Sequence, residues 1–286
     1  MYIRERITIL KSDTLSKYRT FHHFENYGEI KTAKDYIFYL EWAKQNNKEI
    51  FILGNGSNTL FTRKKIETLV LKNMIKPEIT CISEDENLYE ISTSEMASKV
   101  LNYCYKKSLD SFYYLASVPA TIGGALAMNA GKGRKDNKSI YDFVESVTYV
   151  DSDGSIKVIN RSEMDIGFRK TMFTGCQDKF ILSAVFKFPK TEFNSENPIK
   201  KRVKWSKEHQ DNVLPNCGSV FNTAYGPIIW LVRGLRVGKA HFSSKTWNWI
   251  NNRSRSPIPI LSLILIVRII HFVLLKKCKI ELIRVK

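Results

Sequence analysis

The chain of 286 residues has only five cysteines and five histidines, and none of them stands in a spacing typical of a metal site. The number of cysteines is odd and no CxxC pair occurs, so neither a paired disulfide framework nor a zinc site is indicated. We therefore expect no metal, and reduced thiols of the kind found in cytoplasmic proteins. The cysteines are Cys81, Cys104, Cys176, Cys217 and Cys278.

A continuous apolar run of membrane-spanning length is also missing. The N-terminal residues 1–20 mix charged and apolar side chains, which argues against a cleaved secretory signal. Residues 258–275 are almost wholly apolar but fall short of the ~20 residues that span a bilayer, and they include Arg268 and His271. A terminal helix buried in the protein, with Arg268 and His271 at an edge, is favoured over a span. A role at a membrane surface is the alternative.

Acidic residues are few, since 28 Asp and Glu face 45 Lys and Arg, which gives a formal net charge of +17. Nucleic acid, an anionic membrane or a polyanionic small molecule would each account for such a charge. The lysines are scattered, and no zinc finger, RNP motif or basic heptad region accompanies them, so nucleic acid is disfavoured. With 43% hydrophobic residues the chain has enough apolar material for a globular core.

The periodicity predicts an α+β protein with mostly short strands and no internal repeat. Helical spacing over 33–47 is followed by a strand-like run over 49–53 that ends at Gly54. A second helical segment, 95–108, leads into Gly123 and Gly124. We expect the two glycine-rich loops to face each other.

A β-hairpin is predicted over 143–159, because apolar and polar residues alternate on both sides of Asp153-Gly154. Residues 181–188 alternate similarly and should pair nearby. The polar, basic segment 190–213 is expected to be partly helical and to contain a domain boundary. A smaller C-terminal region would start at about Glu196.

The first glycine-rich loop follows a strand and has the sequence LGNGSNTL over 53–60. Glycine allows positive φ and close approach of the backbone, so successive amides can surround a phosphate. The run matches neither GxGxxG nor a P-loop, because no lysine follows at the required spacing. A tight turn without a ligand is the alternative.

The second glycine-rich loop, 117–131, has the sequence SVPATIGGALAMNAG. Small side chains leave room for a flat ligand, and the paired glycines are expected to expose backbone amides to its phosphates. A closely packed helix start is the alternative. Two such loops in one chain fit a dinucleotide better than either does alone.

These blocks, followed by Phe-Arg at 168–169 and Gly-Ser-Val-Phe at 218–221, resemble the UDP-N-acetylenolpyruvoylglucosamine reductase family from about Phe21 to Lys286. The resemblance implies FAD, NADPH and a UDP-sugar substrate. It also implies a two-part FAD-binding domain (1–75 and 76–195) followed by a smaller α+β substrate-binding domain (196–286). The FAD-binding residues that it implies are Gly54, Asn55, Gly56, Ser57, Asn58, Val118, Pro119, Thr121, Gly123 and Gly124.

Three catalytic residues also follow from the resemblance. Arg169 would stabilise the enolate-like charge that forms when hydride adds to the enolpyruvyl group. Ser219 would then protonate the adjacent carbon, and Glu281 would polarise or orient the same centre. We expect 279–285 to form one strand, with Glu281 facing the flavin and Ile280 and Leu282 on the opposite side. Taken singly, Arg169 is more typical of a solvated cation, Ser219 of a turn hydroxyl and Glu281 of a surface ion pair.

Four positions depart from the family pattern: Phe168 and Thr171 around the arginine, Asn222 after Gly-Ser-Val-Phe, and Thr246 where the family has histidine. The alternatives are therefore a flavoprotein that acts on another nucleotide sugar, or a non-catalytic relative. Neither nucleic-acid binding nor a membrane span is expected, and the oligomeric state is not predicted.

Overall fold

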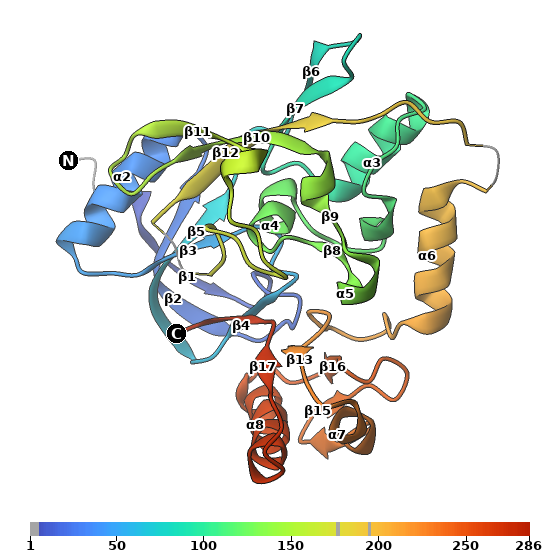
Figure 1. Ribbon diagram of the computed structural model, residues 1–286. Coiled ribbons are helices and arrows are strands. Elements are labelled where there is room, and N and C mark those ends of the chain that lie inside the picture. Colours follow the sequence, from blue (N-terminus) through green and yellow to red (C-terminus); the bar gives the residue numbers. More distant parts are fainter. Residues whose placement is uncertain (1–5, 176–177, 194–195) are drawn as a thin grey trace. The chain divides into compact units, whose positions relative to one another are not determined.

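The computed structural model describes residues 6–175, 178–193 and 196–286, so Cys176 lies outside the described residues. Helices and short strands are mixed along the chain (Figure 1), which confirms the predicted α+β class. The chain divides into two compact units. Unit 1 holds Gly28–Gly54 and Leu69–Lys204 together with Arg6, and unit 2 holds Ile7–Tyr27, Asn55–Thr68 and Trp205–Lys286. The three-part domain division remains a prediction.

A five-stranded sheet in the order β11-β10-β12-β7-β6 forms one part of unit 1, and its neighbouring strands are antiparallel. The predicted hairpin is confirmed, because β10 pairs with β11 around a turn in which Gly154 has a φ of +84°. Strand β12 pairs with β10, as predicted. The strands are β6 (Ile79–Ser83), β7 (Leu88–Ser92), β10 (Val144–Val150), β11 (Ile156–Asn160) and β12 (Phe180–Lys187).

The first glycine-rich loop is reached through the predicted helix and strand. Helix α2 (Ala33–Gln45) begins with a capping box between Thr32 and Asp35. It connects β2 (His22–Ile30) to β3 (Ile50–Leu53), which pairs in parallel with β5 (Lys65–Asn73). The Lys72 ammonium donates to the Gly54 carbonyl and holds the backbone where β3 ends.

Helices α3 (Ala97–Lys106) and α4 (Ile122–Ala127) complete the core of unit 1. The short α4 packs on β7 and β12, and Phe186 and Phe188 stack at 5.5 Å between ring centroids. The remaining elements of this stretch are the 3-10 turns η1 (Tyr113–Leu115), η2 (Ile140–Phe143) and η3 (Arg161–Glu163), β8 (Gly131–Lys132), α5 (Gly133–Asp136), β9 (Lys138–Ser139) and α6 (Pro198–His209). The helix within 190–213 was predicted, and α6 confirms it.

Unit 2 is built from short strands that are distant in sequence. Strand β4 (Thr59–Phe61) pairs in parallel with the C-terminal β18 (Ile283–Val285), so the last strand lies directly beside residues that follow the first glycine-rich loop. Strand β13 (Phe221–Thr223) pairs with β17 (Lys279–Ile280). The other strands of this unit are β1 (Thr8–Ser12), which pairs with β2, and the three-stranded sheet of β14 (Arg236–Val237), β15 (Ala240–Phe242) and β16 (Ile250–Asn252).

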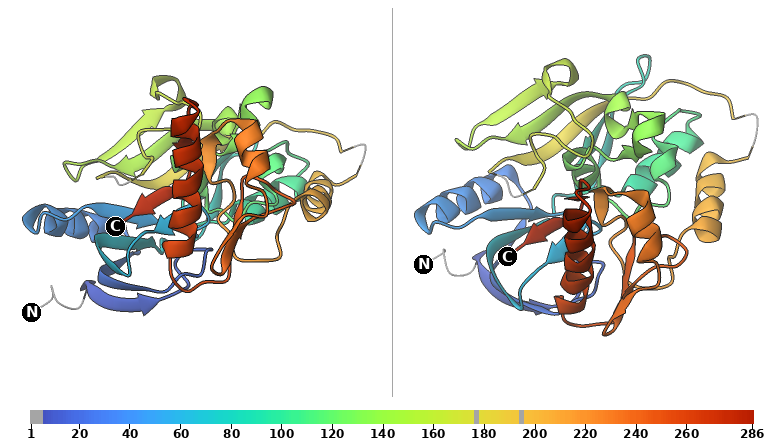
Figure 2. Two further views of the ribbon diagram at one scale, coloured as in Figure 1. Left: turned by 90° about the horizontal axis from the view of Figure 1, so that it is seen from below. Right: turned by 60° about the horizontal axis from the view of Figure 1, so that its bottom comes forward.

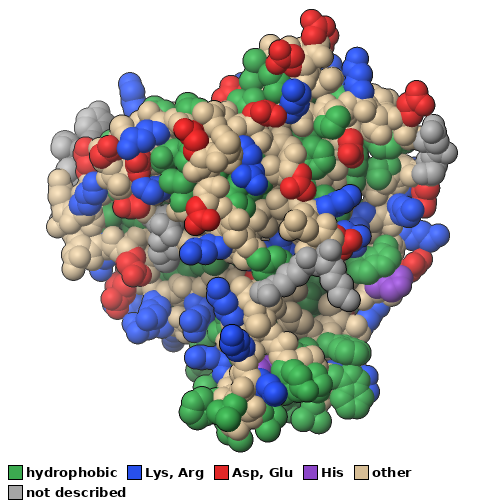
Figure 3. Space-filling view, viewed as in Figure 1, with side chains coloured by type: hydrophobic (Ala, Val, Ile, Leu, Met, Phe, Trp, Pro, Cys, Tyr) green, Lys and Arg blue, Asp and Glu red, His purple; other side chains and the backbone are tan. Residues whose placement is uncertain are grey.

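Helix α8 (Ile258–Val273) packs beside α7 (Gly226–Leu231) and against β14 and β15 (Figures 1 and 2). Ile260, Leu263 and Val267 are buried against this sheet. The prediction of a buried helix is correct for this face only. The other face is exposed, and Figure 3 shows hydrophobic side chains gathered over α7 and α8. Within the described ranges, no helix is both long and apolar enough to cross a membrane.

His271 does not lie at an edge of α8 with Arg268, as predicted, but is almost completely buried. Its Nε2 atom accepts a hydrogen bond of 2.9 Å from the Tyr225 amide at the start of α7, and its Nδ1 atom lies 2.8 Å from the Val267 carbonyl. The neutral imidazole therefore satisfies both partners and caps α7. A long-range backbone partner of this kind leaves no signal in the local sequence.

Candidate functional site

The first glycine-rich loop needs glycine at position 56. Gly56 has a φ of +65°, and a β-carbon there would lie 2.1 Å from the Leu15 carbonyl oxygen, which no side chain tolerates. The Lys17 amide donates to the Gly56 carbonyl at 3.0 Å. Residues 15–17 therefore hold this tight turn in place.

The amides of Gly56, Ser57 and Asn58 donate to no protein acceptor among the residues that the structure describes. Backbone N–H groups without protein partners in a turn of this kind are suited to an anion. The loop thus retains the donors that the sequence predicted for a phosphate.

The paired glycines of the second loop use their amides inside the protein. The Gly123 amide donates to the Thr93 carbonyl at 2.8 Å, and the Gly124 amide donates to the Thr121 hydroxyl at 3.3 Å. The prediction that these amides are free for phosphates is therefore wrong. The reason is that α4 begins here, with Thr121 as its N-cap, and its first turn packs on the segment that follows β7.

The two glycine-rich segments do face each other within unit 1, as predicted. A β-carbon on Gly54 would lie 2.6 Å from the Thr121 hydroxyl oxygen. A β-carbon on Gly124 would lie 3.3 Å from the same hydroxyl oxygen, which is a tight contact, so Gly124 also allows a close approach to Thr121. The side chains of Ser117 and Asn129 each hold a buried oxygen without a protein partner. Buried polar atoms of this kind are normally satisfied, so the second loop has hydrogen-bonding capacity left for a ligand.

Arg169 lies in a tight turn of unit 1 and has a φ of +54°. Its guanidinium donates to the backbone carbonyls of Asn129 at 3.0 Å and Gly131 at 2.9 Å. The side-chain amide of Asn129 donates in turn to the Gly167 carbonyl at 2.8 Å. The end of the second glycine-rich loop therefore fixes both the turn and the charged group. This is a more defined position than that of an ordinary surface cation.

The two residues near Arg169 that depart from the family pattern, Phe168 and Thr171, make different contacts. Thr171 is buried, and its hydroxyl donates to the Ala127 carbonyl at 3.0 Å, so this position still anchors the turn to α4. Phe168 has no hydroxyl, and its ring centroid lies 5.2 Å from the Arg169 guanidinium carbon. Position 168 therefore contributes an aromatic contact to the guanidinium.

Ser219 and Glu281 come from neighbouring segments of unit 2. The Glu281 amide donates to the Val220 carbonyl at 2.8 Å. The Asn58 side-chain amide donates to the Glu281 carbonyl at 3.3 Å, so the first glycine-rich loop adjoins the same place. The structure therefore brings together two of the three predicted catalytic residues and this loop. Arg169, the third predicted catalytic residue, belongs to unit 1.

Glu281 lies at a break between β17 and β18, so the single strand predicted for this segment is interrupted. Leu282 is buried and Ile280 is packed against the core of unit 2, whereas Glu281 is only partly buried. Leu282 is thus a core residue as predicted, Ile280 and Glu281 are both partly buried, and the direction of Glu281 towards the flavin remains a prediction. The interruption follows from pairing with two different partners, β13 and β4.

Cys217 anchors the segment before Ser219. Its thiol lies 3.6 Å from the Gly56 carbonyl and 3.5 Å from the Thr59 carbonyl. Burial raises the pKa of Cys217 to about 11, so the group is a thiol near neutral pH and takes a structural role. Cys81, Cys104 and Cys278 are also free thiols.

Sequence reasoning missed the role of Asn248. Its side chain donates to the Phe221 carbonyl at 2.7 Å and accepts from the Phe221 amide at 3.0 Å. Nearby, the Thr246 hydroxyl accepts from the Asp211 amide at 2.9 Å. The segment that departs from the family pattern therefore supports the strand that follows Ser219.

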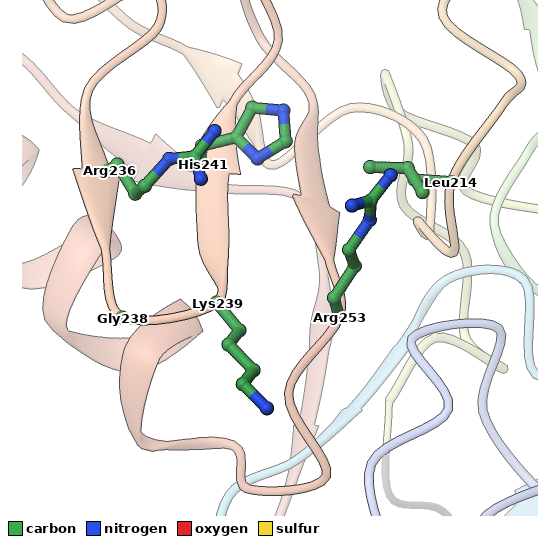
Figure 4. A pocket seen from close by; sticks show the side chains of 6 residues that line it. All are labelled: Leu214, Arg236, Gly238, Lys239, His241 and Arg253. Atoms are coloured by element: carbon green, nitrogen blue, oxygen red, sulfur yellow. The ribbon is translucent and has the colours of Figure 1, made fainter.

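A basic cavity of about 570 Å³ lies in unit 2 (Figure 4), lined by Leu214, Arg236, Gly238, Lys239, His241 and Arg253. Arg236 and His241 are directly opposed on β14 and β15. Burial lowers the pKa of His241, and the nearby Arg236 and Arg253 lower it further, against a smaller opposing effect of Asp211. No carboxylate of a described residue forms an ion pair with its three cations. The cavity is suited to a polyanion, and its members are too scattered in sequence to have been recognised as a set.

The described residues contain no group of three His, Cys, Asp or Glu side chains arranged to hold a metal. The remaining candidate chemistry is therefore carried by Arg169, Ser219 and Glu281 and by the two glycine-rich loops.

Comparisons with known proteins agree with this arrangement. Residues 27–160 match the family model described as FAD binding domain. The UDP-N-acetylenolpyruvoylglucosamine reductase of Pediococcus pentosaceus is 31% identical over 74% of this chain and 70% of its own length. That of Aquifex aeolicus is 28% identical over 79% of this chain and 76% of its own length.

Among solved structures, the UDP-N-acetylenolpyruvylglucosamine reductase of Thermus caldophilus matches with a TM-score of 0.74. The match covers 98% of this chain and 100% of that protein at 18% sequence identity, which supports the fold alone. The sequence relatives, which are 28% and 31% identical over more than two thirds of the chain, show the family. The chain belongs to the UDP-N-acetylenolpyruvoylglucosamine reductase family.

Proposed function

We propose that this chain uses NADPH to reduce the enolpyruvyl group of UDP-N-acetylglucosamine enolpyruvate, giving UDP-N-acetylmuramate for peptidoglycan precursor synthesis. The observation that carries the proposal is the meeting of the Ser219 and Glu281 segments beside the first glycine-rich loop. Family membership supports an FAD-dependent oxidoreductase with NADPH as the reductant. The free thiols are consistent with a cytoplasmic location, which we propose with it.

The residues of both loops fit FAD. The free amides at 56–58 supply donors for the pyrophosphate. Val118, Pro119, Thr121, Gly123 and Gly124 would line the rest of the cofactor, with the unsatisfied Ser117 hydroxyl available to it. When bound, FAD supplies hydride transfer from NADPH to the double bond of the substrate.

Arg169 would stabilise the negative charge that develops on the substrate beside its carboxylate. A guanidinium held by two carbonyls is pre-oriented, so little reorganisation accompanies the reaction. The positive φ of Arg169 and the bonds from Asn129 both serve this orientation. The role of Arg169 therefore depends on the second glycine-rich loop as well as on its own side chain.

Ser219 would donate the proton to the substrate carbon next to the one that receives hydride. It follows Gly218, whose φ of +72° makes the turn into β13. Glu281, joined to the Ser219 segment through the Val220 carbonyl, would orient or polarise that centre. Glu281 lies between β17 and β18, beside the Ser219 segment, so its carboxylate would act at the same centre.

The basic cavity supports a phosphate-bearing substrate. Arg236, Lys239 and Arg253 concentrate positive charge in unit 2 without carboxylate partners in the described part of the chain. Such a field raises the local concentration of a UDP-sugar and of NADPH. The net positive charge of the chain would then attract ligands that carry negatively charged phosphates.

The test is a steady-state assay of NADPH oxidation with UDP-N-acetylglucosamine enolpyruvate as the acceptor, followed by mass determination of the sugar product. We expect turnover and a product two hydrogens heavier than the substrate. Oxidation of NADPH with no change in the mass of this sugar, or turnover only with a different UDP-sugar, would contradict the proposal.

A further inference from the structure

Helix α8 is apolar on two opposite faces. Ile260, Leu263 and Val267 are buried in the core of unit 2, whereas Leu265, Ile269 and Phe272 are 54%, 52% and 80% exposed. Arg268 is the one charged residue among the exposed residues of α8, and a helix face so rich in apolar side chains is normally covered. The exposed face of α8 is therefore a candidate binding surface.

Neighbouring residues enlarge this face. Helix α7 packs beside α8 and adds exposed aromatic and aliphatic side chains, and the end of α8 continues into an exposed run in which Leu275 is 90% accessible. We call these residues the apolar surface: Tyr225, Trp230, Leu231, Ile258, Leu265, Ile269, Phe272, Val273, Leu274 and Leu275. Contiguous apolar surface beyond a few hundred Å² is rare on monomers and marks an interaction site.

Positive charge surrounds the apolar surface. The Arg233 guanidinium carbon lies 4.5 Å from the Trp230 ring centroid, and the Lys276 ammonium lies 5.1 Å from that of Tyr225. No acidic residue occurs anywhere in 212–280, a stretch that contains ten Lys and Arg. The binding partner must therefore offer both an apolar layer and negative charge.

A second copy of the chain does not meet this requirement. A two-fold contact would place the same patch on both sides, so it would bring the cations of both copies, Arg233, Arg268 and Lys276, into one interface with no Asp or Glu from 212–280 to pair with them. An anionic lipid bilayer meets it, because acyl chains lie directly below a negatively charged headgroup layer.

We propose that the apolar surface binds the chain to anionic lipid bilayers, with α8 lying in the interface and not across it. Apolar side chains of such helices enter the headgroup and acyl boundary by ~5–10 Å while basic residues stay at headgroup level. Lys276 and Lys277 follow the exposed end of α8 and are placed for this role. Membrane binding of this kind is independent of the proposed reductase activity.

The test is co-sedimentation of the full-length, FAD-loaded protein with vesicles of phosphatidylcholine alone or with added phosphatidylglycerol. We expect at least tenfold tighter binding to the anionic vesicles, a blue shift of tryptophan fluorescence, and weaker binding as salt is raised. Lys276→Gln with Lys277→Gln should reduce the preference for anionic vesicles roughly tenfold.

The matched pair of variants is Phe272→Glu with Leu275→Glu, against Ile156→Glu with Val158→Glu. Ile156 and Val158 are comparably exposed, at 57% and 64%, but lie on β11 of unit 1. The first pair should lose vesicle binding and the second should keep it, while both retain bound FAD and the reductase activity measured without vesicles.

Three results would overturn the proposal. These are no binding to anionic vesicles, equal loss of binding in both double variants, and a stable dimer that Phe272→Glu with Leu275→Glu dissociates while vesicle binding is unchanged. Retained FAD in the variants separates each of these results from unfolding and from failure of the proposed reductase function.

Discussion

Gly54 lies against Thr121 so closely that a β-carbon at position 54 would come within 2.6 Å of the Thr121 hydroxyl oxygen. Two loops separated by more than sixty residues in sequence therefore meet at their glycines, in the unit that carries most of the FAD-binding family match. Glycine at position 54 is therefore required for the packing of the two loops.

Gly124→Val should weaken FAD binding roughly 10- to 100-fold, the effect of overpacking by ~1–3 kcal/mol. The β-carbon would already lie 3.3 Å from the Thr121 hydroxyl oxygen, and the two methyl groups beyond it would crowd the start of α4, where the cofactor is proposed to bind. Fluorescence titration with FAD and thermal unfolding of the cofactor-free protein measure the two effects separately.

The control is Gly123→Ala, whose β-carbon would come 2.8 Å from that of Thr93. This variant should lower the unfolding temperature of the cofactor-free protein, whereas Gly124→Val should leave it nearly unchanged. Normal FAD affinity in Gly124→Val would remove the second loop from the cofactor site.

Ser219→Ala should leave reduction of the flavin by NADPH nearly intact. Reoxidation by the enolpyruvyl sugar should slow by roughly 10²-fold or more, the size of a lost general acid. Stopped-flow absorbance resolves the two half-reactions. Unchanged reoxidation would mean that another group protonates the substrate.

Glu281→Gln should preserve expression and FAD content, because the backbone bonds from Glu281 to Val220 and Asn58 do not involve the carboxylate. Reduction of the enolpyruvyl group should fall roughly tenfold or more, with a smaller effect on NADPH oxidation. A parallel loss of both half-reactions would instead indicate a general disturbance of the cofactor.

Arg236→Gln should raise the pKa of His241, because the guanidinium disfavours the imidazolium across β14 and β15. Added inorganic pyrophosphate should raise the pKa of His241 in the unmodified protein as well, if the cavity takes a polyanion. NMR titration of the imidazole measures both changes.

The control for His241 is Arg255→Gln, which removes the same charge from a residue paired with Asp13. It should leave the titration of His241 unchanged. A pKa of His241 that responds equally to both substitutions would show a diffuse field and no defined cluster.

Local features were predictable from the sequence because neighbouring residues determine them. Asp153-Gly154 marks the turn of its hairpin, and Thr32 with Asp35 caps α2 within one helical turn. The glycine-rich loops were predictable from their composition and the three polar residues from the resemblance, but the partners of these residues in the fold were not. The Gly123 amide donates to the carbonyl of Thr93, thirty residues earlier, and no local pattern indicates such a partner.

Long-range pairing accounts for the other differences. Strand β18 pairs with β4 across more than 200 residues, and this divides the predicted C-terminal strand at Glu281. For α8, periodicity does not distinguish a buried face from an exposed one when both are apolar. His271 is buried because the distant Tyr225 amide needs an acceptor, which is again a property of the fold.

The most direct test of FAD-dependent enolpyruvyl reduction is the visible absorbance spectrum of the purified protein, recorded anaerobically through two additions. We predict flavin absorbance in the protein as purified or after incubation with FAD. The flavin band should bleach with one equivalent of NADPH and return with one equivalent of UDP-N-acetylglucosamine enolpyruvate. A protein that shows no flavin absorbance after incubation with excess FAD, or whose bleached band does not return with this sugar, would contradict the account.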